Sequence, residues 1–160
     1  MSASLSHQLK RVFVYGTLKR NEPNHHWLTN KENGVSRFVA KGSTLIKFPL
    51  VIGTRYNIPF LLNKPGVGHH IEGEIYDVDE LMFSKLDELE EYPNYYDREQ
   101  QTIVTEQNNQ FQCWLYLIRK YPERLLEKPL LSSYHNTEEQ AYSERSVRDP
   151  SLPAKADLNY

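Results

Sequence analysis

Short stretches of apolar residues, several of them alternating with polar ones, recur up to residue 118 and predict a sheet of short strands. Gly42 indicates a bend or bulge in the second of these strands, and Pro59 favours a sheet edge. Residues 107–110 have the composition of a hairpin turn. Strands are expected at residues 12–15, 35–48, 49–53, 58–62, 69–78, 102–105 and 111–118.

One helix is predicted over residues 81–91. Asp77 and Glu80 have the spacing of a capping box, good helix formers follow, and Pro93 ends the segment. One helix among many short strands predicts an α+β domain around a curved, mostly antiparallel sheet.

The pattern of apolar residues also divides the chain. Residues 1–10 form a loose lead-in, residues 11–131 a single domain, and residues 132–160 a tail that wraps the surface or is partly disordered. From Ser132 onward the large aliphatic residues are Val147, Leu152 and Leu158, too few for a core of their own.

Composition narrows the class of protein. Of 160 residues, 39% are hydrophobic and 25% charged, and the net charge is −2, which argues against binding to nucleic acid or to an anionic membrane. No apolar run reaches the ~20 residues of a membrane span, and the first ten residues lack a secretory signal. Cys113 is the only cysteine, which excludes an internal disulfide and a cysteine-based zinc site. We therefore expect a soluble intracellular protein. We further expect it to be cytoplasmic and monomeric.

Glu90 is the acidic residue of the predicted helix that faces its apolar side. At about 100° per residue, Glu90 projects between Leu86 and Phe83, whereas Asp87 points away from the apolar stripe. Partial burial at the negative end of the helix dipole raises the pKa of a carboxyl, which suits a general acid–base. The alternative is a structural role, in which Glu90 turns to water or pairs with Arg98.

The second candidate is the segment Tyr15-Gly16-Thr17-Leu18 at the end of the first strand. Glycine allows the backbone to approach a ligand, and successive N–H groups in a turn can bind an anion. An ordinary strand-to-loop turn is the alternative.

Other residues are weaker candidates. The adjacent histidines 25–26 and 69–70 point to opposite faces if they lie on strands, so neither pair makes a two-ligand metal site. Cys113 is expected in the core, Lys19 and Arg20 in solvent, and Glu72 and Glu74 on one strand face that lines a pocket or meets water.

An ordered series of motifs resembles the γ-glutamylcyclotransferase-like (AIG2-like) family from about residue 11 to residue 118. The series consists of Val12-Phe13-Val14-Tyr15-Gly16-Thr17-Leu18-Lys19-Arg20, Pro23-Asn24-His25, Pro49-Leu50-Val51-Ile52, Asn57-Ile58-Pro59, Glu72-Gly73-Glu74-Ile75-Tyr76, Leu86-Asp87-Glu88-Leu89-Glu90 and Tyr96-Asp97-Arg98. Asn21 stands where relatives often have glycine, and asparagine tolerates the same left-handed conformation.

The resemblance implies a small mixed, mostly antiparallel β-barrel with flanking helices. It also implies that the backbone of Tyr15, Gly16, Thr17 and Leu18 binds the glutamyl part of a substrate and that Glu90 is the catalytic acid–base. The implied reaction releases 5-oxoproline and a free amine from γ-glutamylamines, notably the γ-L-glutamyl-ε-lysine left by degradation of transglutaminase cross-links. It uses neither metal nor cofactor. Two alternatives stay open: a cyclotransferase for γ-glutamyl amino acids or glutathione, and a non-catalytic module that binds small acids or peptides.

Overall fold

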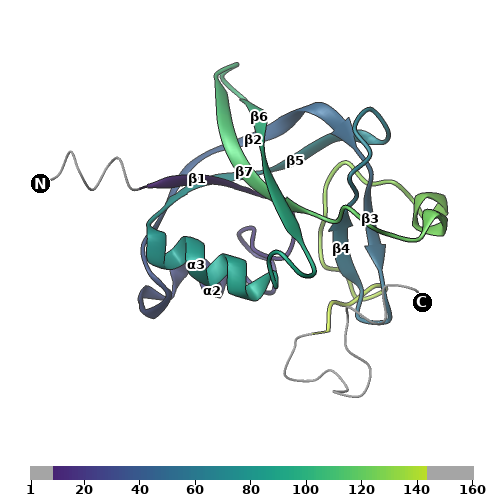
Figure 1. Ribbon diagram of the computed structural model, residues 1–160, viewed down its shortest axis with the longest axis horizontal. Coiled ribbons are helices and arrows are strands. Elements are labelled where there is room, and N and C mark those ends of the chain that lie inside the picture. Colours follow the sequence, from purple (N-terminus) through teal and green to yellow (C-terminus); the bar gives the residue numbers. More distant parts are fainter. Residues whose placement is uncertain (1–8, 144–160) are drawn as a thin grey trace, which may run out of the picture.

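A computed structural model describes residues 9–143, and within them five strands close into a barrel in the order β1-β5-β2-β6-β7 (Figure 1). Neighbouring strands are antiparallel except β1 and β7, which are parallel. The expected α+β fold, a small mixed and mostly antiparallel barrel with flanking helices, is confirmed. The barrel strands are β1 (Lys10–Val14), β2 (Ser36–Phe48), β5 (His69–Val78), β6 (Asp97–Thr105) and β7 (Gln110–Leu117).

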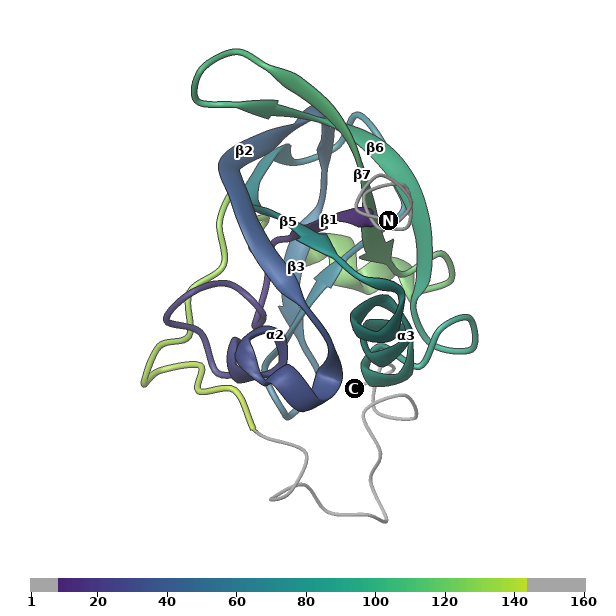
Figure 2. The same ribbon diagram turned by 90° about the vertical axis from the view of Figure 1, so that its left-hand side faces the viewer.

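A two-stranded sheet and short helices flank the barrel. Both views show α2 and α3 at the same end of the barrel (Figures 1 and 2). None of the helices within the described residues is long and apolar enough to cross a bilayer. The flanking elements are β3 (Leu50–Gly53) paired with β4 (Ile58–Leu61), α2 (His26–Thr29), α3 (Glu80–Leu89) and the 3₁₀ turns Lys31–Asn33 and Glu123–Glu127.

Strand β5 has the bounds that the alternating pattern predicts, and it pairs with β1 on one side and β2 on the other. Gly73 of β5 lies opposite Gly42 of β2. A Cβ atom at Gly73 would collide with the carbonyl oxygen of Val14 and lie 2.6 Å from Cζ of Phe13. The predicted irregularity of β2 is confirmed, because its register against β5 shifts on either side of Gly42. Glycine at positions 42 and 73 lets the backbones pack closely.

The core consists of two clusters that lie on opposite faces of the barrel strands. In β7, Leu115 and Leu117 belong to one cluster and Tyr116 to the other, as strand alternation requires. The cluster that contains Tyr116, called the second core cluster below, includes the predicted apolar stripe of α3. The residues of this stripe are buried: Met82, Phe83, Leu86 and Leu89. Helix α3 thus covers the barrel with the face that periodicity assigned to the core.

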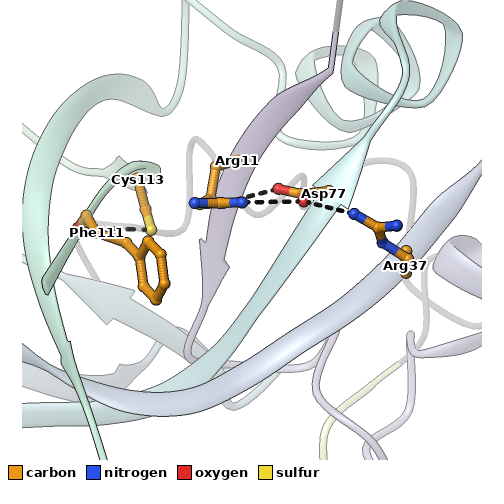
Figure 3. A network of polar contacts seen from close by, with 5 residues as sticks. All are labelled: Arg11, Arg37, Asp77, Phe111 and Cys113. Atoms are coloured by element: carbon orange, nitrogen blue, oxygen red, sulfur yellow. Dashed lines mark hydrogen bonds and ion pairs between the residues drawn. The ribbon is translucent and has the colours of Figure 1, made fainter. Parts of the chain in front are cut away.

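The start of α3 differs from the prediction. Asp79 caps the helix, because its side chain accepts a hydrogen bond from the N–H of Met82. Asp77 instead belongs to β5 and accepts hydrogen bonds from Arg11 (2.8 Å) and Arg37 (3.3 Å) on the neighbouring strands (Figure 3). Burial opposes the charge on Asp77, but the two guanidinium groups outweigh it and hold the pKa of this carboxyl below its usual value.

The described part of the predicted tail packs on the domain. Tyr134 is fully buried, and the N–H of Glu72 donates a hydrogen bond to the carbonyl of Ser132 (2.8 Å). The yellow-green segment in Figure 1 runs alongside the sheet of β3 and β4. Residues 1–8 of the predicted lead-in and 144–160 of the predicted tail lie outside the described residues, and the boundary at residue 131 stays a prediction.

Candidate active site

A cavity opens where β1 ends, between the turn that follows β1 and the C-terminal end of α3. Strand β4, strand β7 and the segment before residue 143 complete its walls. Among the described residues that line the cavity, Glu90 is the only one whose side chain ordinarily carries a charge at neutral pH. The cavity is lined by Phe13, Val14, Tyr15, Gly16, Thr17, Leu18, Asn24, Ile58, Pro59, Leu89, Glu90, Tyr95, Tyr96, Tyr116 and Tyr142.

The turn of residues 15–18 is held in place by the segment that follows it. The N–H of Asn24 donates to the carbonyl of Thr17 (2.8 Å), and the Asn24 side-chain amide donates to the Thr17 hydroxyl (3.0 Å). A ring nitrogen of His25 lies 2.8 Å from the carbonyl oxygen of Leu18. Among the described residues, no hydrogen bond of this turn uses the N–H groups of residues 16–18, which leaves these donors for a ligand.

Glu90 forms the C-terminal cap of α3 rather than part of its last turn. Its N–H donates to the carbonyl of Leu86 (2.9 Å), and its own carbonyl accepts from the N–H of Tyr96 (3.3 Å). The residue is half-buried and lines the cavity together with the predicted turn. The helix projection therefore predicted the correct side, and the structure brings together all five predicted site residues.

Tyrosines surround Glu90 and shape the electrostatics of the cavity. Burial raises the pKa of Tyr15 and Tyr96 well above its usual value, and the negative charge of Glu90 raises it further. Both phenols are therefore neutral at physiological pH. Tyr15 donates its hydroxyl hydrogen to the carbonyl of Tyr116 (2.6 Å), and Tyr96 donates to that of Pro59 (3.0 Å). Glu90 supplies the only carboxyl group among the described residues that line the cavity.

Arg98 pairs with Asp87 and not with Glu90, in contrast to the structural alternative considered above. Its Nε lies 2.9 Å from a carboxylate oxygen of Asp87, and the hydroxyl of Tyr116 donates to the same oxygen (2.7 Å). The guanidinium also stacks within 5 Å of three ring centroids, those of Phe83, Tyr92 and Trp114.

This network fixes Tyr116 in the wall of the cavity, and sequence reasoning missed it. The helix projection placed Asp87 away from the apolar stripe, and its partners come from β6 and β7. The sequence did hold one signal for a link between Asp87 and the site. Asp87 and Glu90 are at positions i and i+3, a spacing that places two side chains next to each other on a helix.

Other candidate residues lie elsewhere. Lys19 is buried rather than exposed: its ammonium donates to the carbonyl of Tyr134 (2.6 Å), and burial lowers its pKa. Glu74 is buried too and accepts from the N–H of Arg20 (3.0 Å), whereas Glu72 is exposed. Cys113 lies in the core as expected, and burial raises the pKa of its thiol to about 12.

Residues 12–136 match the sequence profile of a family described as gamma-glutamyl cyclotransferase, AIG2-like. The chain belongs to this family. The matched segment contains the turn after β1 and Glu90, so the resemblance noted from the sequence is confirmed.

Individual relatives of this AIG2-like protein cover most of its length. It is 69% identical over 150 residues to "Putative gamma-glutamylcyclotransferase CG2811" of Drosophila melanogaster, with 94% of both chains covered. It is 42% identical over 130 residues to gamma-glutamylaminecyclotransferase of Bos taurus, covering 81% of this chain and 77% of that one. Its fold is similar to the crystal structure of an AIG2-like protein from Mus musculus, with a TM-score of 0.84 and 38% identity over 89% of this chain and 100% of that one.

Proposed function

We propose that this chain is a γ-glutamylamine cyclotransferase, which converts γ-glutamylamines such as γ-L-glutamyl-ε-lysine into 5-oxoproline and a free amine. The family supports a γ-glutamyl cyclotransferase, and the name of the bovine relative supports γ-glutamylamines as substrates. One observation carries the proposal: Glu90 is the only charged side chain lining the cavity, in the described chain, and it shares that cavity with the turn of residues 15–18.

The reaction needs no nucleophile from the protein. The α-amine of the substrate attacks its own γ-carbonyl carbon, a C–N bond closes a five-membered ring, and the C–N bond to the departing amine breaks. Because both reacting groups belong to one molecule, holding the folded-back conformer removes much of the entropic barrier. Two protons leave the α-ammonium and two reach the departing amine, so no water is consumed.

Glu90 carries these protons in the proposed mechanism. As a base it takes one proton from the α-ammonium before the attack, and as an acid it gives that proton to the leaving nitrogen when the tetrahedral intermediate collapses. The second proton leaves the new ring nitrogen and reaches the released amine through the same carboxyl, which ends the cycle ionised. The neutral phenols of Tyr15 and Tyr96 support this role, because they bring neither a competing acid nor a second negative charge to the cavity.

The turn of residues 15–18 binds the anionic oxygens of the glutamyl part in this proposal. Its support is the set of N–H groups at Gly16, Thr17 and Leu18, which line the cavity and donate no hydrogen bond within the described chain. Preorganised backbone donors of this kind stabilise negative charge without reorganising during the reaction.

A second candidate is a cyclotransferase for γ-glutamyl amino acids or glutathione. The observation that favours it is the name of the Drosophila relative at 69% identity, which specifies a gamma-glutamylcyclotransferase and no amine.

For the first candidate we propose a cytoplasmic role in disposing of γ-L-glutamyl-ε-lysine from degraded transglutaminase cross-links, carried out by a monomer.

Release of 5-oxoproline from two substrates tests the proposal. The purified chain is incubated in parallel with γ-L-glutamyl-ε-lysine and with glutathione, and 5-oxoproline is quantified over time. We expect kcat/KM for the lysine compound to exceed that for glutathione by about tenfold or more. The reverse preference would support the second candidate. No release from either compound would overturn the proposed activity and leave the binding module.

A further inference from the structure

The segment of residues 132–143 reaches from the barrel to the mouth of the cavity and places Tyr142 among the lining residues. Its first half is anchored by the buried ring of Tyr134, whose carbonyl accepts from Lys19 (2.6 Å). The N–H of Asn136 then donates to a carboxylate oxygen of Glu22 (2.9 Å). The segment is thus attached to the loop that follows the turn of residues 15–18.

Contacts on both sides of Tyr142 fix its position. The carbonyl of Ala141 accepts from the side-chain amide of Asn57 (2.9 Å), and the N–H of Ser143 donates to the carbonyl of Tyr56 (2.9 Å). The N–H of Tyr142 itself donates to the side-chain oxygen of Asn136 (2.8 Å). A residue held at both neighbours and at its own backbone presents its side chain in a defined direction.

The Tyr142 side chain is linked directly to the turn that the proposed function assigns to the glutamyl group. Its hydroxyl accepts a hydrogen bond from the side-chain amide of Asn24 (3.0 Å), and the same amide nitrogen donates to the hydroxyl of Thr17 (3.0 Å). Asn24 is buried, and both hydrogen bonds are partly buried. The Tyr142 ring also packs partly buried against the second core cluster.

We propose that Tyr142 is a specificity residue that contacts the aliphatic chain of the departing amine. The inference rests on the proposed function: if the turn and Glu90 hold the glutamyl group and the reacting amide, the part of the substrate beyond the amide meets the remaining walls. Those walls combine aliphatic residues with aromatic rings, among them Tyr95, Tyr116 and Tyr142. An aromatic ring packs well against methylene groups and presents a face that also attracts a cationic amine.

Two substrates of different length separate this role from a structural one. Tyr142→Ala is compared with the wild type on γ-L-glutamyl-ε-lysine and on γ-glutamylmethylamine, whose amine has no chain beyond one methyl group. We expect Tyr142→Ala to lower kcat/KM for the lysine compound by about tenfold, mainly through KM, and to change the methylamine compound by less than about threefold. Tyr142→Phe retains the ring and should stay within about threefold of wild type on both.

A matched control lies on the same segment. Gln140→Ala removes an exposed side chain that does not line the cavity, and we expect it to leave both substrates unchanged. Two outcomes would overturn the specificity role and leave the proposed function intact. One is an equal loss of kcat/KM on both substrates in Tyr142→Ala. The other is a fall in the affinity of this variant for 5-oxoproline that matches its fall in kcat/KM. No turnover of either compound by the wild type would overturn the proposed function, and the inference with it.

Discussion

Glu90→Gln is expected to lower kcat for γ-L-glutamyl-ε-lysine by roughly 10²–10⁴-fold, the usual contribution of a general acid–base. Glutamine keeps the shape of the side chain but cannot take up a proton. Because the product holds no reacting ammonium, its binding does not depend on that proton. The affinity for 5-oxoproline should therefore stay within about threefold of wild type. Steady-state kinetics and calorimetric titration with 5-oxoproline measure the two quantities.

The control for this substitution is Glu88→Gln, on the same helix. The Glu88 side chain is 72% exposed and lies 3.5 Å from the ammonium of Lys85, away from the cavity. An exposed ion pair of this kind contributes little to stability, so the variant should match the wild type in kcat and in unfolding. Parental turnover by Glu90→Gln would contradict the assignment of Glu90, as would equal losses in both variants.

Gly73→Ala is expected to lower the free energy of unfolding by about 3 kcal/mol, the upper part of the usual range for overpacking. The new methyl group would meet the carbonyl oxygen of Val14 and the buried ring of Phe13. Backbone atoms of β1 and β5 must then separate, and Val14 directly precedes the turn of residues 15–18. We therefore expect a loss of affinity for 5-oxoproline as well. Urea denaturation and calorimetry test both effects.

Gly66→Ala provides the comparison. Apart from Gly66 and its two neighbours in the chain, no atom of residues 9–143 lies within 4 Å of a Cβ built at Gly66, and the φ of +93° makes backbone strain the main cost. We expect a smaller loss of about 1–2 kcal/mol and unchanged affinity for 5-oxoproline. If the two glycine variants lost the same stability, close packing of β1 on β5 would not be the reason for glycine at position 73.

Local patterns predicted much of the fold because their causes are local. The alternation over residues 69–78 gave both ends of β5, and the period of α3 gave its buried face and the side on which Glu90 lies. The misassigned cap shows where local patterns stop: Asp77 and Asp79 both precede the helix, but Asp77 pairs with Arg11 and Arg37 on the neighbouring strands, which the local sequence does not reveal.

The remaining parts of the site depend on contacts between distant segments. Tyr142 meets Asn24 across 118 residues of sequence, and Lys19 meets the carbonyl of Tyr134 across 115. Neither the loop of residues 19–24 nor the segment of residues 134–142 has a periodicity that indicates its partner. The burial of Lys19 was therefore missed, and Tyr142 was not a candidate at all. Asp87 is similar, since its role follows from Arg98 and Tyr116 on two strands of the barrel.

A crystal structure with 5-oxoproline bound is the decisive test of the assignment of Glu90 and the turn of residues 15–18 to one substrate site. We expect the ligand to occupy the cavity at the end of β1, with its carboxylate or ring oxygen accepting hydrogen bonds from N–H groups of residues 16–18. The Glu90 carboxyl should lie within hydrogen-bond reach of its ring. A ligand bound in another cavity, such as the one between Lys19 and Glu72, or a Glu90 carboxyl turned away from the bound ring, would contradict this assignment.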